Sequence, residues 1–112
     1  MRAQELEAGF AVTSQILPKQ MAEVAAAGYR AVICNLPDGE GWLQPGHDKV
    51  AEAAKAAGLD FRYIPVSGGI GPDETSAMAE AMTSLPKPIV AFCRSGARSA
   101  ALWQQWRMST PA

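Results

Sequence analysis

The stretch Ile89-Val90-Ala91-Phe92-Cys93-Arg94-Ser95-Gly96-Ala97-Arg98-Ser99 decides the fold of this chain. Its first four residues are apolar and predict a short strand buried on both faces, as in a parallel sheet. The polar residues that follow contain a glycine and lead into a helix predicted over residues 99–108. Because ligands of such α/β sheets bind beyond the carboxyl ends of the strands, the sequence predicts a functional loop directly after this strand.

The remainder of the chain repeats the same alternation of strands and helices. Further strands are predicted at residues 10–12, 31–34 and 61–66, and further helices at residues 19–27, 48–57 and 73–84. The first two of these helices stop at Gly28 and Gly58, which suit the left-handed backbone after a helix end. Polar segments rich in Pro and Gly, 35–41 and 67–72, are predicted loops. We therefore expect one three-layer α/β domain over residues 1–112, with a mainly parallel sheet of about four strands.

The composition argues against several classes of function. The 112 residues carry a formal net charge of -1, so no basic field attracts nucleic acid. No apolar run approaches the ~20 residues that span a bilayer, and the acidic N-terminus lacks the apolar core of a secretory signal. Two cysteines make no disulfide framework, and a single histidine without a Cys-x-x-Cys motif argues against a zinc site. We expect a cytoplasmic protein with no cofactor, metal, membrane or nucleic-acid partner.

The loop after the strand has the composition of an anion site built around a nucleophilic thiol. Gly96 allows the backbone to curl tightly, and a curled loop entering a helix directs several N–H groups inward. Such a setting, together with nearby arginines, lowers the pKa of a cysteine and favours the thiolate. Arg98 can hold an oxyanion through two parallel hydrogen bonds. The sequence predicts Cys93 and Arg98 as catalytic residues, in an anion-binding loop formed by Arg94, Ser95, Gly96, Ala97, Arg98 and Ser99.

Two resemblances follow from these residues. The segment 92–99 resembles the active-site loop of single-domain rhodaneses, which carry sulfane sulfur as a cysteine persulfide. Residues 10–106 as a whole are similar to the bacterial family described as beta-lactamase hydrolase-like protein, phosphatase-like domain, which is also labelled a sulfur transferase family. That family resemblance implies the fold of the dual-specificity (tyrosine) phosphatases. It is carried by the loop together with Asn35-Leu36-Pro37-Asp38-Gly39-Glu40, Tyr63-Ile64-Pro65-Val66 and Gly68-Gly69-Ile70.

The departures from the cysteine phosphatases favour sulfur transfer. Those enzymes resemble His-Cys-x5-Arg, whereas here Phe92 replaces the histidine and Arg98 comes one residue early. They also use a general acid, and Ser67-Gly68-Gly69 stands where compact members have an aspartate. Sulfur transfer needs no such acid, because sulfite or a thiolate leaves already charged. The expected function is therefore a sulfurtransferase that carries sulfane sulfur as a Cys93 persulfide, from a small anionic donor such as thiosulfate to a nucleophilic acceptor.

Two alternatives stay open. The first is a cysteine-dependent phosphatase that acts on a phosphate ester through a Cys93 phosphoenzyme, with its acid to be found at Asp38, Glu40 or Asp73. The second is a non-catalytic module that only binds anions. Asp38 and Glu40 follow a strand that ends on the same sheet edge as Cys93, so they are candidate pocket acids; the competing interpretation is a Pro-Asp-Gly turn with solvated carboxylates.

Three further features complete the sequence-based expectations. Cys34 is expected to be a buried thiol, with a resolving partner of Cys93 as the alternative. His47 precedes a helix and is expected at the surface or as a cap. Trp103 and Trp106 lie three residues apart on the last helix, where core packing is expected and a partner or dimer surface is the alternative.

Overall fold

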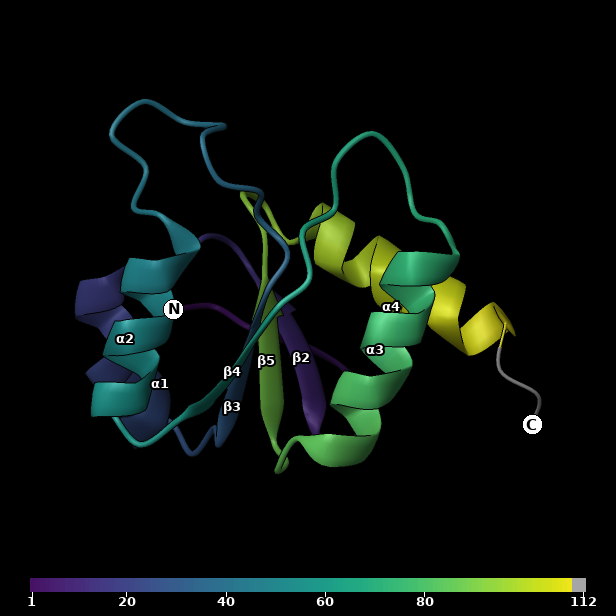
Figure 1. The fold of residues 1–112 in the computed structure, drawn as a ribbon. Coiled ribbons are helices and arrows are strands. Elements are labelled where there is room, and N and C mark those ends of the chain that lie inside the picture. The colour runs from purple at the N-terminus through teal and green to yellow at the C-terminus, as the bar shows by residue number, and fades with distance from the viewer. Residues whose placement is uncertain (110–112) are drawn as a thin grey trace.

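The computed structural model of the chain describes residues 1–109, and in them a five-stranded sheet lies between two layers of helices (Figure 1). The strand order across the sheet is β1-β2-β5-β3-β4, and all neighbours run parallel except β1, which is antiparallel to β2. The three-layer α/β fold with a mainly parallel sheet is therefore confirmed. The strands are β1 (Gln4–Glu7), β2 (Phe10–Thr13), β3 (Ala31–Cys34), β4 (Asp60–Tyr63) and β5 (Ile89–Phe92).

The alternation of side chains along the strands builds the two cores. In β3, Val32 and Cys34 pack into a buried cluster under η1 (Pro18–Gln20), α1 (Met21–Ala26) and α2 (His47–Ala56). Ala31 and Ile33 pack on the opposite face, under α3 (Pro72–Ser84) and α4 (Ala97–Ser109). Figure 1 shows α1 and α2 on one side of the sheet and α3 and α4 on the other. Every residue of β2, β3 and β5 is buried, as a parallel sheet covered on both faces requires.

The structure differs from the prediction in one strand and in several element boundaries. β1 was missed because its sequence, Gln-Glu-Leu-Glu, has no pair of alternating apolar residues; such charge is typical of an edge strand. β4 stops at Tyr63 because Pro65 has no N–H to continue the ladder. The first predicted helix divides into η1 and α1, and α4 begins two residues earlier than expected. The last difference places Arg98 inside the first turn of a helix.

The parallel strands bring four loops to one edge of the sheet, with β5 in the centre. β5 lies between β2 and β3, so Cys93 emerges among the loops that follow both neighbours. The N–H of Gln15 donates to the Arg94 carbonyl at 3.2 Å, and the N–H of Asn35 donates to the Phe92 carbonyl at 2.8 Å. The segments after β3 and β4 rise from this same edge (Figure 1). The fold therefore encloses the start of the Cys93 loop from both sides.

The two tryptophans of α4 are packed within the chain. Trp106 belongs to the buried cluster beneath α3 and α4, and Trp103 packs against that cluster and donates its indole N–H to Glu7 of β1 at 2.6 Å. The Arg107 guanidinium also binds Glu7 and lies 4.4 Å from the Trp106 ring centroid. The core-packing expectation is confirmed, and the alternative of a dimer surface built on these indoles has no support.

Within residues 1–109, no helix is both long and apolar enough to cross a membrane.

Leu102 tests how strongly α4, which carries the arginine of the candidate site, is anchored to the sheet. Its side chain is fully buried, so Leu102→Ala removes apolar contacts and leaves a cavity. We expect a loss of about 2–5 kcal/mol in the free energy of unfolding, measured by urea denaturation. Met108→Ala on the exposed end of the same helix is the control and should change stability little. Equal effects of the two substitutions would contradict this packing.

Candidate active site

The Cys93 sulfur lies buried inside a tightly curled loop. The residue is 1% exposed, and the Gly96 N–H donates to its Sγ at 3.1 Å. Gly96 has φ +96, and a Cβ built there would lie 3.2 Å from the carbonyl oxygen of Thr13 at the end of β2. Both the left-handed backbone and the close contact with β2 therefore require glycine. The predicted role of Gly96 in closing the loop is confirmed.

The surroundings of Cys93 favour the thiolate. Burial by itself would raise the pKa of the Cys93 thiol. Hydrogen bonds from the backbone N–H groups of Ser99, Arg98, Ser95 and Gly96 outweigh that effect and lower the pKa. The groups of Arg98 and Ser99 belong to the first turn of α4, where N–H groups have no partner within the helix. The early start of α4 therefore supplies two of the four donors.

Arg98 is fixed at the mouth of the loop by Glu40. Its Nη1 and Nη2 donate to the two carboxylate oxygens of Glu40 at 2.7 and 2.9 Å, and Nη1 also donates to the Val66 carbonyl at 3.0 Å. Interactions with Glu40 and with the Cys93 sulfur raise the pKa of Arg98. The bonds to Glu40 and Val66 leave the Nε–H and the second Nη2 hydrogen to meet an oxyanion.

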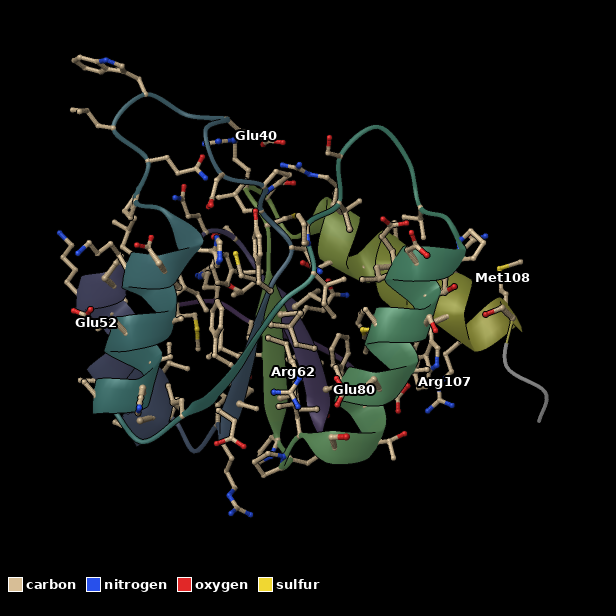
Figure 2. The ribbon with its side chains drawn as sticks, in the orientation of Figure 1. Glu40, Glu52, Arg62, Glu80, Arg107 and Met108 are labelled. Atoms are coloured by element: carbon tan, nitrogen blue, oxygen red, sulfur yellow. The ribbon has the colours of Figure 1, made fainter. Side chains whose placement is uncertain are left out.

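Glu40 and Asp38, the two candidate pocket acids, have different surroundings. Glu40 lies at the sheet edge that holds the Cys93 loop, far from the Arg62–Glu80 pair and from Arg107 (Figure 2). The bidentate hydrogen bond from Arg98 lowers the pKa of Glu40. Asp38 instead binds His47, which lowers the pKa of Asp38. The structure thus brings only Glu40 to Arg98, and it holds both side chains as carboxylates.

Asp38, His47 and Tyr63 form a clamp at the base of the 35–46 loop. The His47 Nδ1 lies 2.6 Å from one Asp38 oxygen, and the His47 backbone N–H donates to the other at 2.8 Å. The His47 ring stacks on Tyr63 with centroids 3.8 Å apart, and the Tyr63 hydroxyl accepts from the Asp38 N–H at 3.0 Å. His47 is half-exposed, as expected of a surface residue. Through its contacts with Asp38 and Tyr63 it also fixes the loop that carries Glu40.

Arg94 is held against the same loop. Its Nη2 donates to Gln44 Oε1 at 3.1 Å and lies 3.8 Å from Glu40 Oε1. A Cβ at Gly41 would lie 3.0 Å from Arg94 Nη2, so the absence of a side chain at Gly41 makes room for the guanidinium. Gln44 also braces the loop by accepting from the Gly41 N–H and donating to the Pro37 carbonyl. Sequence reasoning gave no role to Gln44, which belongs to no recognisable motif, and it included Tyr63 only as part of the strand motif Tyr63-Ile64-Pro65-Val66.

Ser95 and Ser99 are the two serines of the Cys93 loop. Ser95 Oγ accepts from the Ala97 N–H at 3.3 Å. Ser99 is buried, and its hydroxyl has no hydrogen-bond partner among residues 1–109. Because α4 begins at Ala97, Ser99 lies in its first turn and does not cap the helix.

Cys34 is a buried thiol, as expected. It is 2% exposed and donates to the Leu36 carbonyl at 3.5 Å. Burial raises the pKa of Cys34 to about 11, so this thiol stays protonated where Cys93 is ionised. Both cysteines are free thiols. Within the described part of the chain, no group of His, Cys, Asp or Glu could hold a metal ion.

In this chain a central parallel strand leads into an amide-lined loop that holds a cysteine, and the next helix carries an arginine in its first turn. This is the architecture of the cysteine-phosphatase-like α/β domains. The chain belongs to the family described as "Beta-lactamase hydrolase-like protein, phosphatase-like domain", whose model matches residues 3–109. The family resemblance expected from the sequence is thus confirmed.

Curated proteins and solved structures agree with this assignment. A beta-lactamase hydrolase-like protein of Agrobacterium fabrum is 32% identical over 104 residues, which make up 92% of this chain and 24% of that protein. The chain thus spans about a quarter of the length of the curated relatives it matches. A Neisseria meningitidis structure named "putative phosphatase" has a TM-score of 0.81 at 24% identity and covers 96% of this chain and 78% of its own. The catalytic core of the PP-IP phosphatase SIW14 from S. cerevisiae has a TM-score of 0.62 at 14% identity, with coverage of 95% and 74%.

The sulfurtransferase prediction was wrong. The matched family is described as phosphatase-like, and the similar structures carry phosphatase names. The short spacing between Cys93 and Arg98 and the lack of an acid after β4 therefore do not indicate sulfur transfer. In the structure, the early start of α4 places Arg98 at the loop mouth despite the short spacing. The rhodanese-like loop is therefore compatible with a phosphatase-like domain.

The two thiols should titrate far apart. Cys93 should ionise below the ordinary pKa of a thiol because four N–H groups hold its thiolate, whereas Cys34 should ionise near its pKa of about 11. Thiolate ultraviolet absorbance against pH measures both steps. Cys93→Ser should remove the lower step only, and Cys34→Ala the upper step only. Because folding lowers the Cys93 pKa, ionisation of Cys93 stabilises the fold at pH values above the ordinary thiol pKa. This stabilisation is lost as the pH falls through the lowered pKa of Cys93. A lower step that survives in Cys93→Ser would contradict the assignment.

Proposed function

We propose that this domain is a cysteine-dependent phosphatase that hydrolyses phosphate esters through a Cys93 phosphoenzyme. The observation that carries the proposal is the buried Cys93 sulfur, which accepts a hydrogen bond from the Gly96 N–H at 3.1 Å. The backbone N–H groups of Ser95, Arg98 and Ser99 also lower its pKa, and Arg98 interacts with the sulfur. A site of this kind stabilises a thiolate and can also hold the oxygens of a phosphoryl group. The phosphatase-like description of the family and the phosphatase named in S. cerevisiae support the same chemistry.

The reaction proceeds in two displacements. The Cys93 thiolate attacks phosphorus, so an S–P bond forms as the ester O–P bond breaks and the leaving oxygen takes the bonding electrons. Water then attacks the phosphocysteine; the S–P bond breaks, the thiolate returns and inorganic phosphate leaves. The loop N–H groups and the remaining donors of Arg98 hold the non-bridging oxygens in both steps. Each such donor is worth about 10²–10³ in rate when it meets charge that develops in the transition state.

Glu40 acts in this mechanism as the residue that positions Arg98. Its two carboxylate oxygens bind the end of the guanidinium, while the Val66 carbonyl binds one of the same nitrogens. The planar fork of Arg98 is thereby oriented before a substrate arrives, which reduces the ordering cost of binding. The restricted rotation of Arg98 directs its remaining donors toward the sulfur and the phosphoryl oxygens.

Two broader expectations stay predictions. One is that residues 1–112 work as a single catalytic domain, whatever the length of the full protein. The other is that the protein works in the cytoplasm.

Replacement of the nucleophile tests the proposal. Cys93→Ser should abolish the release of p-nitrophenol from p-nitrophenyl phosphate, because the serine hydroxyl stays protonated at neutral pH and is a weak nucleophile. Cys34→Ala is the matched control, since Cys34 is buried outside the loop and should keep the activity. Acid quenching of the wild type followed by intact-mass spectrometry should detect one phosphoryl group, which peptide mapping assigns to Cys93. Phosphate release that persists in Cys93→Ser would overturn the proposed function.

A further inference from the structure

The leaving group of the proposed reaction needs either a proton or a stabilising charge. Both carboxylates of the 35–46 loop are engaged as anions: Glu40 by two bonds from Arg98, and Asp38 by the His47 ring and backbone N–H. A carboxylate fixed in this way accepts hydrogen bonds and has no proton to give. The two acids that the sequence brought to this edge therefore do not suit the role of proton donor.

A cation does stand at the mouth of the loop. Arg94 follows Cys93 directly in the chain, and its side chain is about half exposed and lies 3.8 Å from Glu40, whereas Cys93 is buried. In phosphoryl transfer, the attacking and leaving atoms lie roughly in line through phosphorus. A leaving oxygen opposite the buried sulfur thus points outward, to the side of the loop where the Arg94 guanidinium lies.

The position of Arg94 is built by the neighbouring loop. Gln44 accepts a hydrogen bond from its Nη2, Glu40 lies 3.8 Å away, and Gly41 leaves the space that the guanidinium fills. Gln44 is itself held by the Gly41 N–H and the Pro37 carbonyl. An exposed arginine is ordinarily free to sample many rotamers, but this one is oriented before any substrate binds.

On the basis of the proposed function, we propose that Arg94 is a further catalytic residue, which stabilises the leaving group as an anion in place of a proton donor. The O–P bond breaks, the leaving oxygen keeps the electron pair, and its negative charge develops against the guanidinium without transfer of a proton. The expected substrates are therefore phosphates whose leaving group is a stable anion: phosphoanhydrides, acyl phosphates and aryl phosphates. Simple alkyl phosphates should be poor substrates, because an alkoxide cannot leave unprotonated.

A series of aryl phosphates measures the charge on the leaving oxygen. We would determine kcat/KM for dinitrophenyl, p-nitrophenyl and phenyl phosphate, with acetyl phosphate and an alkyl phosphate as additional substrates. Without a proton donor, log kcat/KM should fall steeply as the leaving group becomes more basic. Asp38→Asn and Asp73→Asn should each leave that slope unchanged; Glu40→Gln is not used for the slope, because Glu40 lies beside both Arg98 and Arg94.

Variants at Arg94 separate its charge from its position. Arg94→Gln should lower kcat/KM for phenyl phosphate about 10-fold or more and that for dinitrophenyl phosphate only slightly, so that the slope steepens. Gly41→Ala keeps the charge but places a methyl group 3.0 Å from Arg94 Nη2, and a smaller steepening is expected. Arg62→Gln is the matched control, because Arg62 pairs with Glu80 away from the loop (Figure 2) and should change no slope.

The outcomes distinguish the two proposals. If the wild type hydrolyses dinitrophenyl phosphate with a shallow slope that steepens in Asp38→Asn or Asp73→Asn, a proton donor exists and the role of Arg94 is overturned. If Arg94→Gln lowers all the rates by the same factor, Arg94 only binds the phosphoryl group and the inference also fails. If no phosphate is released in a Cys93-dependent manner from any compound of the series, the proposed function itself fails.

Discussion

The hydrogen bonds from backbone N–H groups to the buried Cys93 sulfur are the interaction on which the rest of the site depends. A thiolate removed from water is costly unless donors replace the lost solvent, and each charge-assisted bond contributes about 1.5–3 kcal/mol. The donors converge only because Gly96 turns the loop against the end of β2 and α4 starts at Ala97. The burial of α4 through Leu102 is therefore also a condition for the ionisation of Cys93.

The 35–46 loop supplies the second constraint, since it orients both arginines. Glu40 holds Arg98, and Gln44 with Gly41 holds Arg94. The loop is fixed in turn at its base, where Asp38 binds the first residue of α2. The sheet thus positions the sulfur, and one loop between β3 and α2 positions the cations. A change in this loop can alter which leaving groups are accepted without disturbing the nucleophile.

Much of this architecture could be predicted from the sequence, because it follows from local patterns. The buried apolar runs of β3 and β5 and the glycine in the Cys93 loop each carry a direct physical reason. The carboxyl ends of the four parallel strands meet at one edge of the sheet, and this places the loop with Asp38 and Glu40 at the same edge as Cys93. β1 could not be predicted because it lacks alternating apolar residues. The contacts of its Glu7 could not be predicted because Trp103 and Arg107 lie about a hundred residues away. The same applies to the pairing of Glu40 with Arg98, which depends on rotamers rather than on spacing.

The wrong prediction of function has its origin in the expected proton donor. The missing aspartate after β4 argues against phosphoryl transfer only if the leaving group must receive a proton. That requirement holds for alkyl esters, but a stable leaving anion needs only a favourable potential. An arginine fixed beside the nucleophile provides such a potential, and Arg94 is fixed there by three residues of the neighbouring loop. Under the proposed function, the lack of an acid after β4 therefore constrains which phosphates the site can cleave rather than whether it can cleave them.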